Sequence, residues 1–418
     1  METIIGLKGR EVLNAKGNPT VEAELITSSG LHLFASVPSG ASTGKYEAFE
    51  LYDGGTRYGG RGTLTAANTI STTIRDALIG MDVTRQSEID GLLCSLDGTA
   101  NKSRLGANAI LPVSLAVARA AASSMDIPLF EYINSMQAMG SMGIPDIIAT
   151  VISGGVFSPS GLEFEDYMYV LGGFEAFSDQ LEALVRLRRH LEKIVCGQFG
   201  VVPEDGGALA PPIRSSEEAF DLMLECARDL GLEDHVSLGI DVAASELFDE
   251  GTGTYYAGIG HRLSKQKLID RYVALCEAYP LTLIEDGVEE NDFDGFCEIS
   301  TRMPSIQVVG DDLFATNVSR IQTGIEMKSA NTLLLKVNQI GTLTEALAAS
   351  RLAQSNGMDV IVSLRSGETE DDFIADLAVG IGAKQIKLGS PVRLERNTKY
   401  NRLLRISENL SAPDKKSF

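Results

Sequence analysis

Three carboxylates and one lysine each stand directly after a short apolar run in this sequence. Asp241 follows Val-Ser-Leu-Gly-Ile, Glu285 follows Leu-Thr-Leu-Ile, and Asp311 follows Ile-Gln-Val-Val-Gly. Lys336 follows Thr-Leu-Leu-Leu. Carboxylate oxygens with no cysteine or histidine beside them suit Mg²⁺. A lysine that is buried or close to a cation can accept a proton. The four residues therefore predict proton abstraction next to a carboxylate, with Mg²⁺ stabilising the negative charge that results.

A simpler interpretation assigns these four residues no chemistry. Each acid could cap the loop that follows its strand, and Lys336 could balance the charge of the carboxylates. A single acid would favour that interpretation. Acids after three consecutive apolar runs favour a shared site, provided that the fold brings the ends of those runs together.

The elements that must position these residues are predicted strands that end at one mouth. Apolar runs recur through residues 145–418, separated by helix patterns such as 216–230 and 264–276. Continuous apolar strands alternating with helices indicate a parallel sheet covered by helices. At least six such units favour a closed (β/α)8 TIM-type barrel, whose active site lies at the C-terminal strand ends. Arg365, Ser366 and Lys387 fall at the next two strand ends, where cations would hold a phosphate-like group.

The first part of the chain, residues 1–135, predicts a smaller α+β domain. Residues 21–26 alternate apolar and polar side chains, Ser-Ser-Gly forms a turn, and residues 31–37 return, which is a hairpin pattern. Residues 66–80 and 105–125 read as helices. The second is the most apolar stretch of the chain, but Asn108, Pro112 and Arg119 interrupt it. It is therefore expected to be a buried helix and not a membrane span.

The net charge of −21 disfavours whole classes of partner. A nucleic acid or an anionic membrane would be repelled by such a surface. A small anionic substrate would need a locally cationic pocket or a bound metal ion. The five cysteines are scattered and odd in number, which argues against disulfides and structural zinc. With no signal-peptide pattern at the start, we expect a reducing, cytoplasmic location.

Several longer segments resemble the enolase family along nearly the whole chain. They include Gly-Asn-Pro-Thr-Val-Glu at 17–22, Pro-Ser-Gly-Ala-Ser-Thr-Gly at 38–44 and Asn-Lys-Ser-Arg-Leu-Gly-Ala-Asn-Ala-Ile-Leu at 101–111. Asp-Val-Ala-Ala-Ser-Glu at 241–246, Leu-Lys-Val-Asn-Gln-Ile-Gly-Thr-Leu at 335–343 and Arg-Ser-Gly-Glu-Thr-Glu-Asp at 365–371 match as well. The resemblance implies an α+β N-terminal domain, a (β/α)8 barrel, and assembly as a homodimer or a higher homo-oligomer.

The same resemblance implies roles for the candidate residues. It places a first Mg²⁺ on Asp241, Glu285 and Asp311, and a second Mg²⁺ that arrives with substrate and is held by its phosphate and Ser39. Lys336 matches the base that removes the C2 proton of 2-phosphoglycerate. Arg365 and Ser366 match phosphate contacts, and Lys387 matches the lysine that helps to bind the substrate carboxylate and the metal.

The chain departs from the family pattern around the leaving group and the closing loop. Phe157 stands where the family has a loop histidine, and Leu364 replaces the histidine of Ser-His-Arg. Asp166 and Asp205 each replace a glutamate, and the position of Asp205 is that of the acid that protonates the leaving hydroxyl. A catalytic group misplaced by about 1 Å can lose about a hundredfold in rate. We therefore treat Phe157 and Leu364 as candidate substrate contacts, and Asp166 and Asp205 as candidate catalytic residues.

These departures leave three functional hypotheses. The first is a divergent paralogue with shifted chemistry, similar to carboxyphosphonoenolpyruvate synthase of phosphonate and phosphinate antibiotic pathways, with a nucleotide-activated co-substrate. The second is a true enolase in which the two aspartates replace the glutamates. The third is a non-catalytic binding protein on an enolase fold. Because Lys336 and all three metal acids are retained, we favour an enzyme, and the altered leaving-group side favours the first hypothesis.

Overall fold

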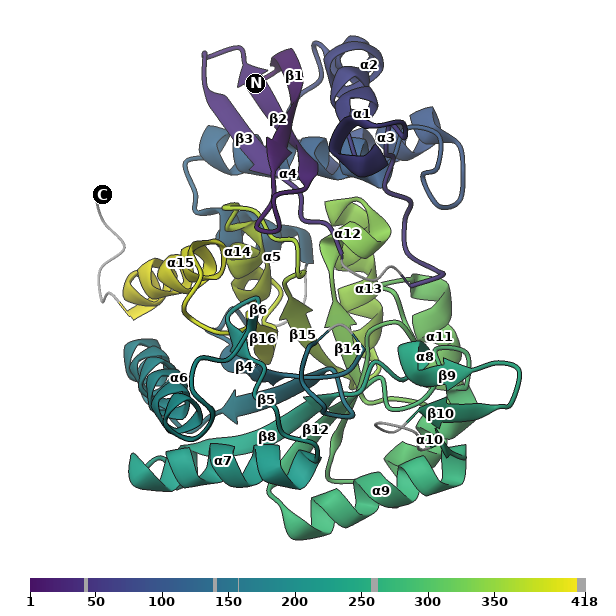
Figure 1. Cartoon of the computed structure of the whole chain (residues 1–418). Coiled ribbons are helices and arrows are strands. Elements are labelled where there is room, and N and C mark those ends of the chain that lie inside the picture. The colour runs from purple at the N-terminus through teal and green to yellow at the C-terminus, as the bar shows by residue number, and fades with distance from the viewer. Residues whose placement is uncertain (41–43, 138–140, 157, 257–261, 412–418) are drawn as a thin grey trace.

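A small antiparallel sheet opens the chain, and a closed eight-stranded barrel follows it (Figure 1). The computed structural model describes residues 1–40, 44–137, 141–156, 158–256 and 262–411. The predicted combination of an α+β N-terminal part with a TIM-type barrel is confirmed.

The N-terminal sheet has the order β1–β2–β3 and packs mainly against one buried helix, while shorter helical segments contact β1. Alternate residues of β2 are buried, and β2 and β3 form the predicted hairpin. The alanine-rich helix α4 lies against β2 and β3 and is buried over most of its length, as its sequence predicts. The elements are β1 (Ile4–Leu13), β2 (Pro19–Thr27), β3 (His32–Ser36), α1 (Leu64–Thr69), a π-helical turn η2 (Ile70–Ile74), α2 (Arg75–Leu78), α3 (Gln86–Asp97), α4 (Ala107–Ser124) and α5 (Leu129–Gln137).

Eight strands close the barrel, because the last pairs with the first. Their interior is a packed cluster of apolar side chains that includes Ile148, Met168, Leu283, Leu334 and Ile361. The barrel therefore has a solid core, and only its rim is available for binding. In spatial order the strands are β4 (Asp146–Ser153), β5 (Asp166–Leu171), β8 (Val236–Asp241), β12 (Leu281–Glu285), β13 (Gln307–Gly310), β14 (Thr332–Leu335), β15 (Asp359–Ser363) and β16 (Gln385–Lys387).

One strand of the barrel corrects the expectation of a fully parallel sheet. β5 runs antiparallel to both of its neighbours, β4 and β8. The described residues between β4 and β5 contain no helix, and the antiparallel pairing shows that the chain turns back instead of crossing over. The reversal puts the first residue of β5, Asp166, beside the last residue of β8, Asp241. The N-terminal end of β5 thus joins the rim formed by the C-terminal ends of the other strands.

Helices cover the outside of the barrel (Figure 1), and several begin with a side-chain cap. Ser215, Ser264 and Thr342 each accept a hydrogen bond from the backbone N–H three residues on. The covering helices are α6 (Phe177–Phe199), α7 (Ser216–Asp229), α9 (Lys265–Ala278), α10 (Phe293–Arg302), α11 (Val318–Met327), α13 (Leu343–Ser355), α14 (Phe373–Gly380) and α15 (Leu394–Ser411). Short helices α8 (Ala244–Leu247) and α12 (Val337–Ile340) follow β8 and β14.

Two small β elements decorate the barrel. A hairpin of β6 (Glu204–Asp205) and β7 (Ala208–Leu209) joins the edge of β4. A separate sheet contains β9 (Phe248–Asp249), β10 (Thr254–Tyr256) and β11 (Arg262–Leu263).

No single helix in the described ranges is long and apolar enough to cross a membrane. One pair of helices, α4 with α5, is long and apolar enough when taken together, but the two helices are bent by 105°.

Loops of the N-terminal part lie over the rim of the barrel. Ser39 pairs with Gly367 through two backbone hydrogen bonds of 3.0 Å. The amide of Ala15 donates to the carbonyl of Glu368, and the amide of Ala48 donates to the carbonyl of Gln339. The C-terminal strand ends are therefore covered by a second part of the chain, which can supply residues to a site there.

Candidate active site

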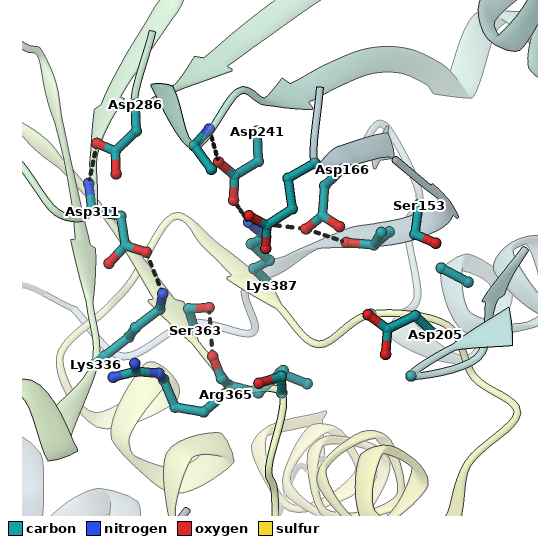
Figure 2. Close-up of a pocket in the computed structure, with 18 of the residues that line it drawn as sticks. Ser153, Asp166, Asp205, Asp241, Asp286, Asp311, Lys336, Ser363, Arg365 and Lys387 are labelled. Atoms are coloured by element: carbon teal, nitrogen blue, oxygen red, sulfur yellow. Dashed lines mark hydrogen bonds and ion pairs between the residues drawn. The ribbon is translucent and has the colours of Figure 1, made fainter. Parts of the chain in front are cut away.

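A cavity of about 140 Å³ lies at the rim, between the strand ends and the loops over them (Figure 2). One water needs only about 10–15 Å³ of such space, so the cavity has room for several waters or for a small metabolite. Among the described residues, eight Asp and Glu side chains line it against four Lys and Arg side chains. An anionic substrate would be repelled by this excess of carboxylates unless a cation offset them.

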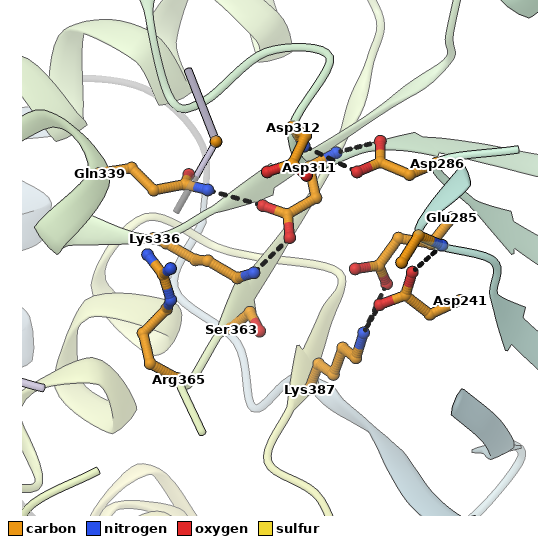
Figure 3. Close-up of polar contacts among 12 residues, drawn as sticks. Asp241, Glu285, Asp286, Asp311, Asp312, Lys336, Gln339, Ser363, Arg365 and Lys387 are labelled. Carbon is orange, nitrogen blue, oxygen red and sulfur yellow. Dashed lines mark hydrogen bonds and ion pairs between the residues drawn. The ribbon is translucent and has the colours of Figure 1, made fainter. Parts of the chain in front are cut away.

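Lys387 is the cation shared by the carboxylates of β8 and β12 (Figure 3). Its Nζ lies 2.9 Å from Asp241 Oδ2 and 2.7 Å from Glu285 Oε2. Burial opposes the charge on Lys387, but Asp241 and Glu285 outweigh it and raise the pKa of the amine well above its usual value. The amine is therefore charged and balances part of the carboxylate charge.

Asp311 and Lys336 form a second ion pair across the ends of β13 and β14 (Figure 3). The other oxygen of Asp311 accepts a hydrogen bond of 2.7 Å from Gln339 Nε2. Burial alone would raise the pKa of Asp311, but Lys336 lowers it. Burial would likewise lower the pKa of Lys336, and Asp311 raises it instead. Lys336 is thus an ammonium while it faces an ionised Asp311, which differs from the lowered pKa expected from the sequence.

The three predicted metal acids fit a divalent cation in one specific respect. Glu285 is 1% exposed, and its Oε1 is buried with no hydrogen-bond partner among the described residues. Burying a carboxylate oxygen without a hydrogen-bond donor costs free energy unless a cation or a water molecule contacts that oxygen. The all-oxygen donor set of Asp241, Glu285 and Asp311 also matches the preference of Mg²⁺. The residues present therefore fit the ion that the sequence predicts.

A different carboxylate group, Asp286 with Asp311 and Asp312, places one oxygen from each within 4.8 Å. Asp286 uses both oxygens to accept backbone N–H groups, 3.0 Å from Asp311 N and 2.8 Å from Asp312 N. Since these bonds tie the end of β12 to the end of β13, we assign Asp286 to holding the two strand ends in register. Asp311 belongs both to this group and to the predicted metal acids.

Arg365 is oriented by a residue from the N-terminal part. Glu47 makes a two-pronged ion pair with its guanidinium, with N–O distances of 2.8 and 3.1 Å, and both side chains are almost fully buried. Asn338 Oδ1 accepts a third bond at 3.2 Å. Paired parallel bonds of this kind fix the plane of a guanidinium. Ser366 and Leu364 line the cavity on either side of Arg365, and Ser363 lies at the end of β15 (Figure 2).

The two aspartates that replace glutamates lie at different places around the cavity (Figure 2). Asp166 accepts a hydrogen bond of 3.0 Å from Thr150 and lies 3.5 Å from Lys387 Nζ. Burial raises its pKa above the ordinary value. Asp205 belongs to the β6–β7 hairpin and faces the same space from another side, with Lys16 Nζ 4.0 Å from its carboxylate. Both acids thus line the same cavity as Asp241 and Asp311, although they come from separate elements.

Of the two remaining candidates, one lies outside the cavity lining and the other is not among the described residues. Ser39 lies outside the lining that the described residues form, and its hydroxyl accepts a hydrogen bond of 2.7 Å from Asn14. Its backbone is fixed to Gly367, so it borders the loop that carries Arg365. Phe157 falls outside the described residues.

The structure also brings in residues that the sequence analysis did not select as site residues. Glu165 lines the cavity next to Asp166, and Glu47 reaches it from the N-terminal part. Burial, followed by the charges of Asp241 and Asp166, raises the pKa of Glu165 well above its usual value. Glu165 could have been found, because it directly precedes Asp166. Nothing in the spacing of Glu47 indicates that it pairs with Arg365, 318 residues away.

Comparison with known proteins gives matches over both parts of the chain. Residues 4–133 match the family model described as "Enolase, N-terminal domain", and residues 141–416 match "Enolase, C-terminal TIM barrel domain". A protein named Enolase from Methanopyrus kandleri is 48% identical over 417 residues, which covers 98% of this chain and 97% of that protein. Enolases from Methanocaldococcus jannaschii and Pyrococcus furiosus are 47% and 46% identical, over 96% and 97% of this chain and 94% and 95% of their own lengths.

These matches correct the favoured functional hypothesis. The prediction of a divergent paralogue with shifted, carboxyphosphonoenolpyruvate synthase-like chemistry is wrong, because full-length relatives at 44–48% identity carry the name Enolase. The physical reason lies in the two shortened acids. Asp166 and Asp205 still line the cavity together with Lys336, Asp241 and Asp311, so the shorter side chains leave both carboxylates in the site. The predicted role in an antibiotic pathway and the predicted nucleotide-activated co-substrate depended on that hypothesis and are withdrawn with it.

Proposed function

Since the chain belongs to the enolase family, we propose that it is an Mg²⁺-dependent lyase that converts 2-phosphoglycerate to phosphoenolpyruvate and water. The observation that carries the proposal is that Lys336, Arg365 and Lys387 line one cavity together with Asp241 and Asp311, and that Lys387 is also bonded to Glu285. A base, a rigid phosphate contact and an all-oxygen metal site are the three parts that this reaction requires.

Binding would use the cations of the last strand ends. Arg365, held in its plane by Glu47, presents donors for a phosphate, and Ser366 adds a hydroxyl beside it. Lys387 would hold the substrate carboxylate near Asp241 and Glu285, the residues to which it is bonded. A bound Mg²⁺ on Asp241, Glu285 and Asp311 would supply positive charge that stabilises the negative charge developing on that carboxylate.

Two proton transfers complete the reaction. Lys336, as a neutral amine, would accept the proton from C2, and the electron pair left on C2 would form the double bond as the C3–O bond breaks. Asp205 would donate a proton to the departing hydroxyl, which leaves as water. The pairing with Asp311 favours the ammonium form of Lys336, so the base becomes competent when the charge of Asp311 is offset.

The direct test is turnover of 2-phosphoglycerate by the purified full chain with Mg²⁺, followed by the ultraviolet absorbance of the enolpyruvate product. We expect formation of phosphoenolpyruvate that stops when EDTA removes the metal. Absence of product at saturating Mg²⁺ and substrate would overturn the proposal. Light scattering on the same preparation tests the proposed homodimer or higher oligomer, and a calorimetric titration with Mg²⁺ counts the ions bound with and without substrate.

A further inference from the structure

Asp205 is carried to the cavity by a very short hairpin. β6 (Glu204–Asp205) and β7 (Ala208–Leu209) have two residues each, and the hairpin joins the barrel through the pairing of Leu209 with Ile152 of β4. Gly206 and Gly207 form the turn with φ of +54° and +90°, the left-handed conformation that this tight turn requires at both positions. With so few strand bonds, the hairpin depends on other contacts for its position.

A fully buried arginine of α6 holds one side of the hairpin. Arg188 is 0% exposed, and its Nε donates to the carbonyl of Gly207 at 2.9 Å. Its Nη2 donates to Glu204 Oε1 at 2.8 Å. The two bonds therefore fix Glu204, which precedes Asp205, and Gly207, the second residue of the turn that follows Asp205. A guanidinium that makes several bonds in one plane fixes position and orientation together.

A second buried arginine, from α15, holds the turn from another direction. Arg396 is 6% exposed, lines the cavity, and donates from Nε to the carbonyl of Gly206 at 2.6 Å. The fit is close, because a Cβ built on Gly206 would lie 2.1 Å from Arg396 Nη2. Arg393 adds a more exposed ion pair to Glu204 at 2.6 Å.

We propose that Arg188 and Arg396 are positioning residues that set the place of the Asp205 carboxyl in the reaction. The proposal rests on the proposed function, in which Asp205 protonates the leaving hydroxyl. Both arginines hold main-chain atoms within two residues of Asp205 and come from helices that do not carry the metal acids or Lys336. Moving the hairpin would therefore impair loss of the hydroxyl while leaving removal of the C2 proton intact.

Because only loss of the hydroxyl depends on Asp205, comparing it with removal of the C2 proton distinguishes a positioning role from a merely structural one. If Asp205 is displaced, Lys336 still removes the C2 proton. The resulting ammonium exchanges its hydrogens with the solvent and then returns a solvent-derived hydrogen to C2. Deuterium from D₂O then enters C2 of 2-phosphoglycerate although little water is eliminated. A general loss of folding would lower exchange and elimination by the same factor.

The experiment uses the Mg²⁺-loaded full chain in D₂O, with 2-phosphoglycerate. Nuclear magnetic resonance follows deuterium at C2, and absorbance follows phosphoenolpyruvate. For Arg396→Met we expect kcat for elimination to fall by about 10- to 100-fold, with KM nearly unchanged and the ratio of exchange to elimination raised at least about tenfold. Arg396→Lys should recover part of the loss, because an ammonium can still donate to Gly206. Arg405→Met, an exposed arginine of the same helix, is the control.

A second variant leaves both arginines in place. Gly206→Ala puts a methyl group against Arg396 at a residue with left-handed φ, so it should raise the same ratio. Equal losses of exchange and elimination in Arg396→Met and Gly206→Ala, or full activity in both, would overturn the positioning role while the wild type remains a functioning lyase. A wild-type protein that neither exchanges nor eliminates would remove the proposed function and this inference with it.

Discussion

Glu285→Gln separates the two roles that the structure gives to this buried carboxylate. Lys387 lies 2.9 Å from Asp241, 2.7 Å from Glu285 and 3.5 Å from Asp166, so one ammonium serves three carboxylates. Breaking an isolated buried pair costs about 3–5 kcal/mol. Here the substitution leaves Lys387 paired with Asp241 and keeps an amide oxygen near it. Without metal, we expect the free energy of unfolding to change by no more than about 1.5 kcal/mol.

The response of the same variant to Mg²⁺ should be much weaker. The wild type should gain about 2.7 kcal/mol at a Mg²⁺ concentration one hundred times its Kd. If losing the carboxylate weakens binding about a hundredfold, the same concentration adds only about 0.4 kcal/mol to the variant. The assay is urea unfolding in EDTA and in Mg²⁺ at matched ionic strength. Asp359→Asn is the control, because that carboxylate pairs with Lys384 at the opposite end of β15. An equal Mg²⁺ gain in Glu285→Gln and wild type would refute the metal site.

Three further substitutions test the surroundings of the site. Glu47→Gln should lower the free energy of unfolding by about 3 kcal/mol, because it breaks a buried ion pair. It should also raise KM for 2-phosphoglycerate. Urea unfolding checks the first result and steady-state kinetics the second. Folded Glu165 keeps its proton above its ordinary pKa of 4.5, so in EDTA wild-type stability should fall as pH rises above that value. Glu165→Gln should flatten this dependence in urea unfolding between pH 5 and 8, and an unchanged slope would contradict the assigned protonation. Thr342→Ala should cost about 1 kcal/mol through loss of the α13 cap, and a cost near zero would contradict that assignment.

Sequence reasoning located the strand ends well, because each metal acid closes an apolar run. β8 ends at Asp241 and β12 at Glu285, and Asp311 directly follows β13. The direction of β5 was not predictable in this way, since a short apolar strand has the same pattern whether it runs parallel or antiparallel. That direction is what brings Asp166 to the rim.

Contacts between distant segments were also beyond the reach of the sequence patterns. Arg365 was selected from its place near a strand end, but its partner Glu47 lies in an irregular segment of the N-terminal part. Arg188 reads as one polar residue in an amphipathic helix, although its guanidinium is fully buried against the hairpin of Asp205. Periodicity predicts which face of a helix is apolar, but not which charged side chain of that helix meets a loop.

The central claim is that Lys336 removes the C2 proton of 2-phosphoglycerate, and isotope exchange at that carbon tests it most directly. The wild type with Mg²⁺ in D₂O should incorporate deuterium at C2 and release phosphoenolpyruvate. Lys336→Met should lower both rates by about 10²- to 10⁴-fold, the usual contribution of a general base. Lys384→Met, an exposed lysine just before β16, should keep both rates. Exchange and elimination by Lys336→Met within tenfold of the wild type would contradict the account.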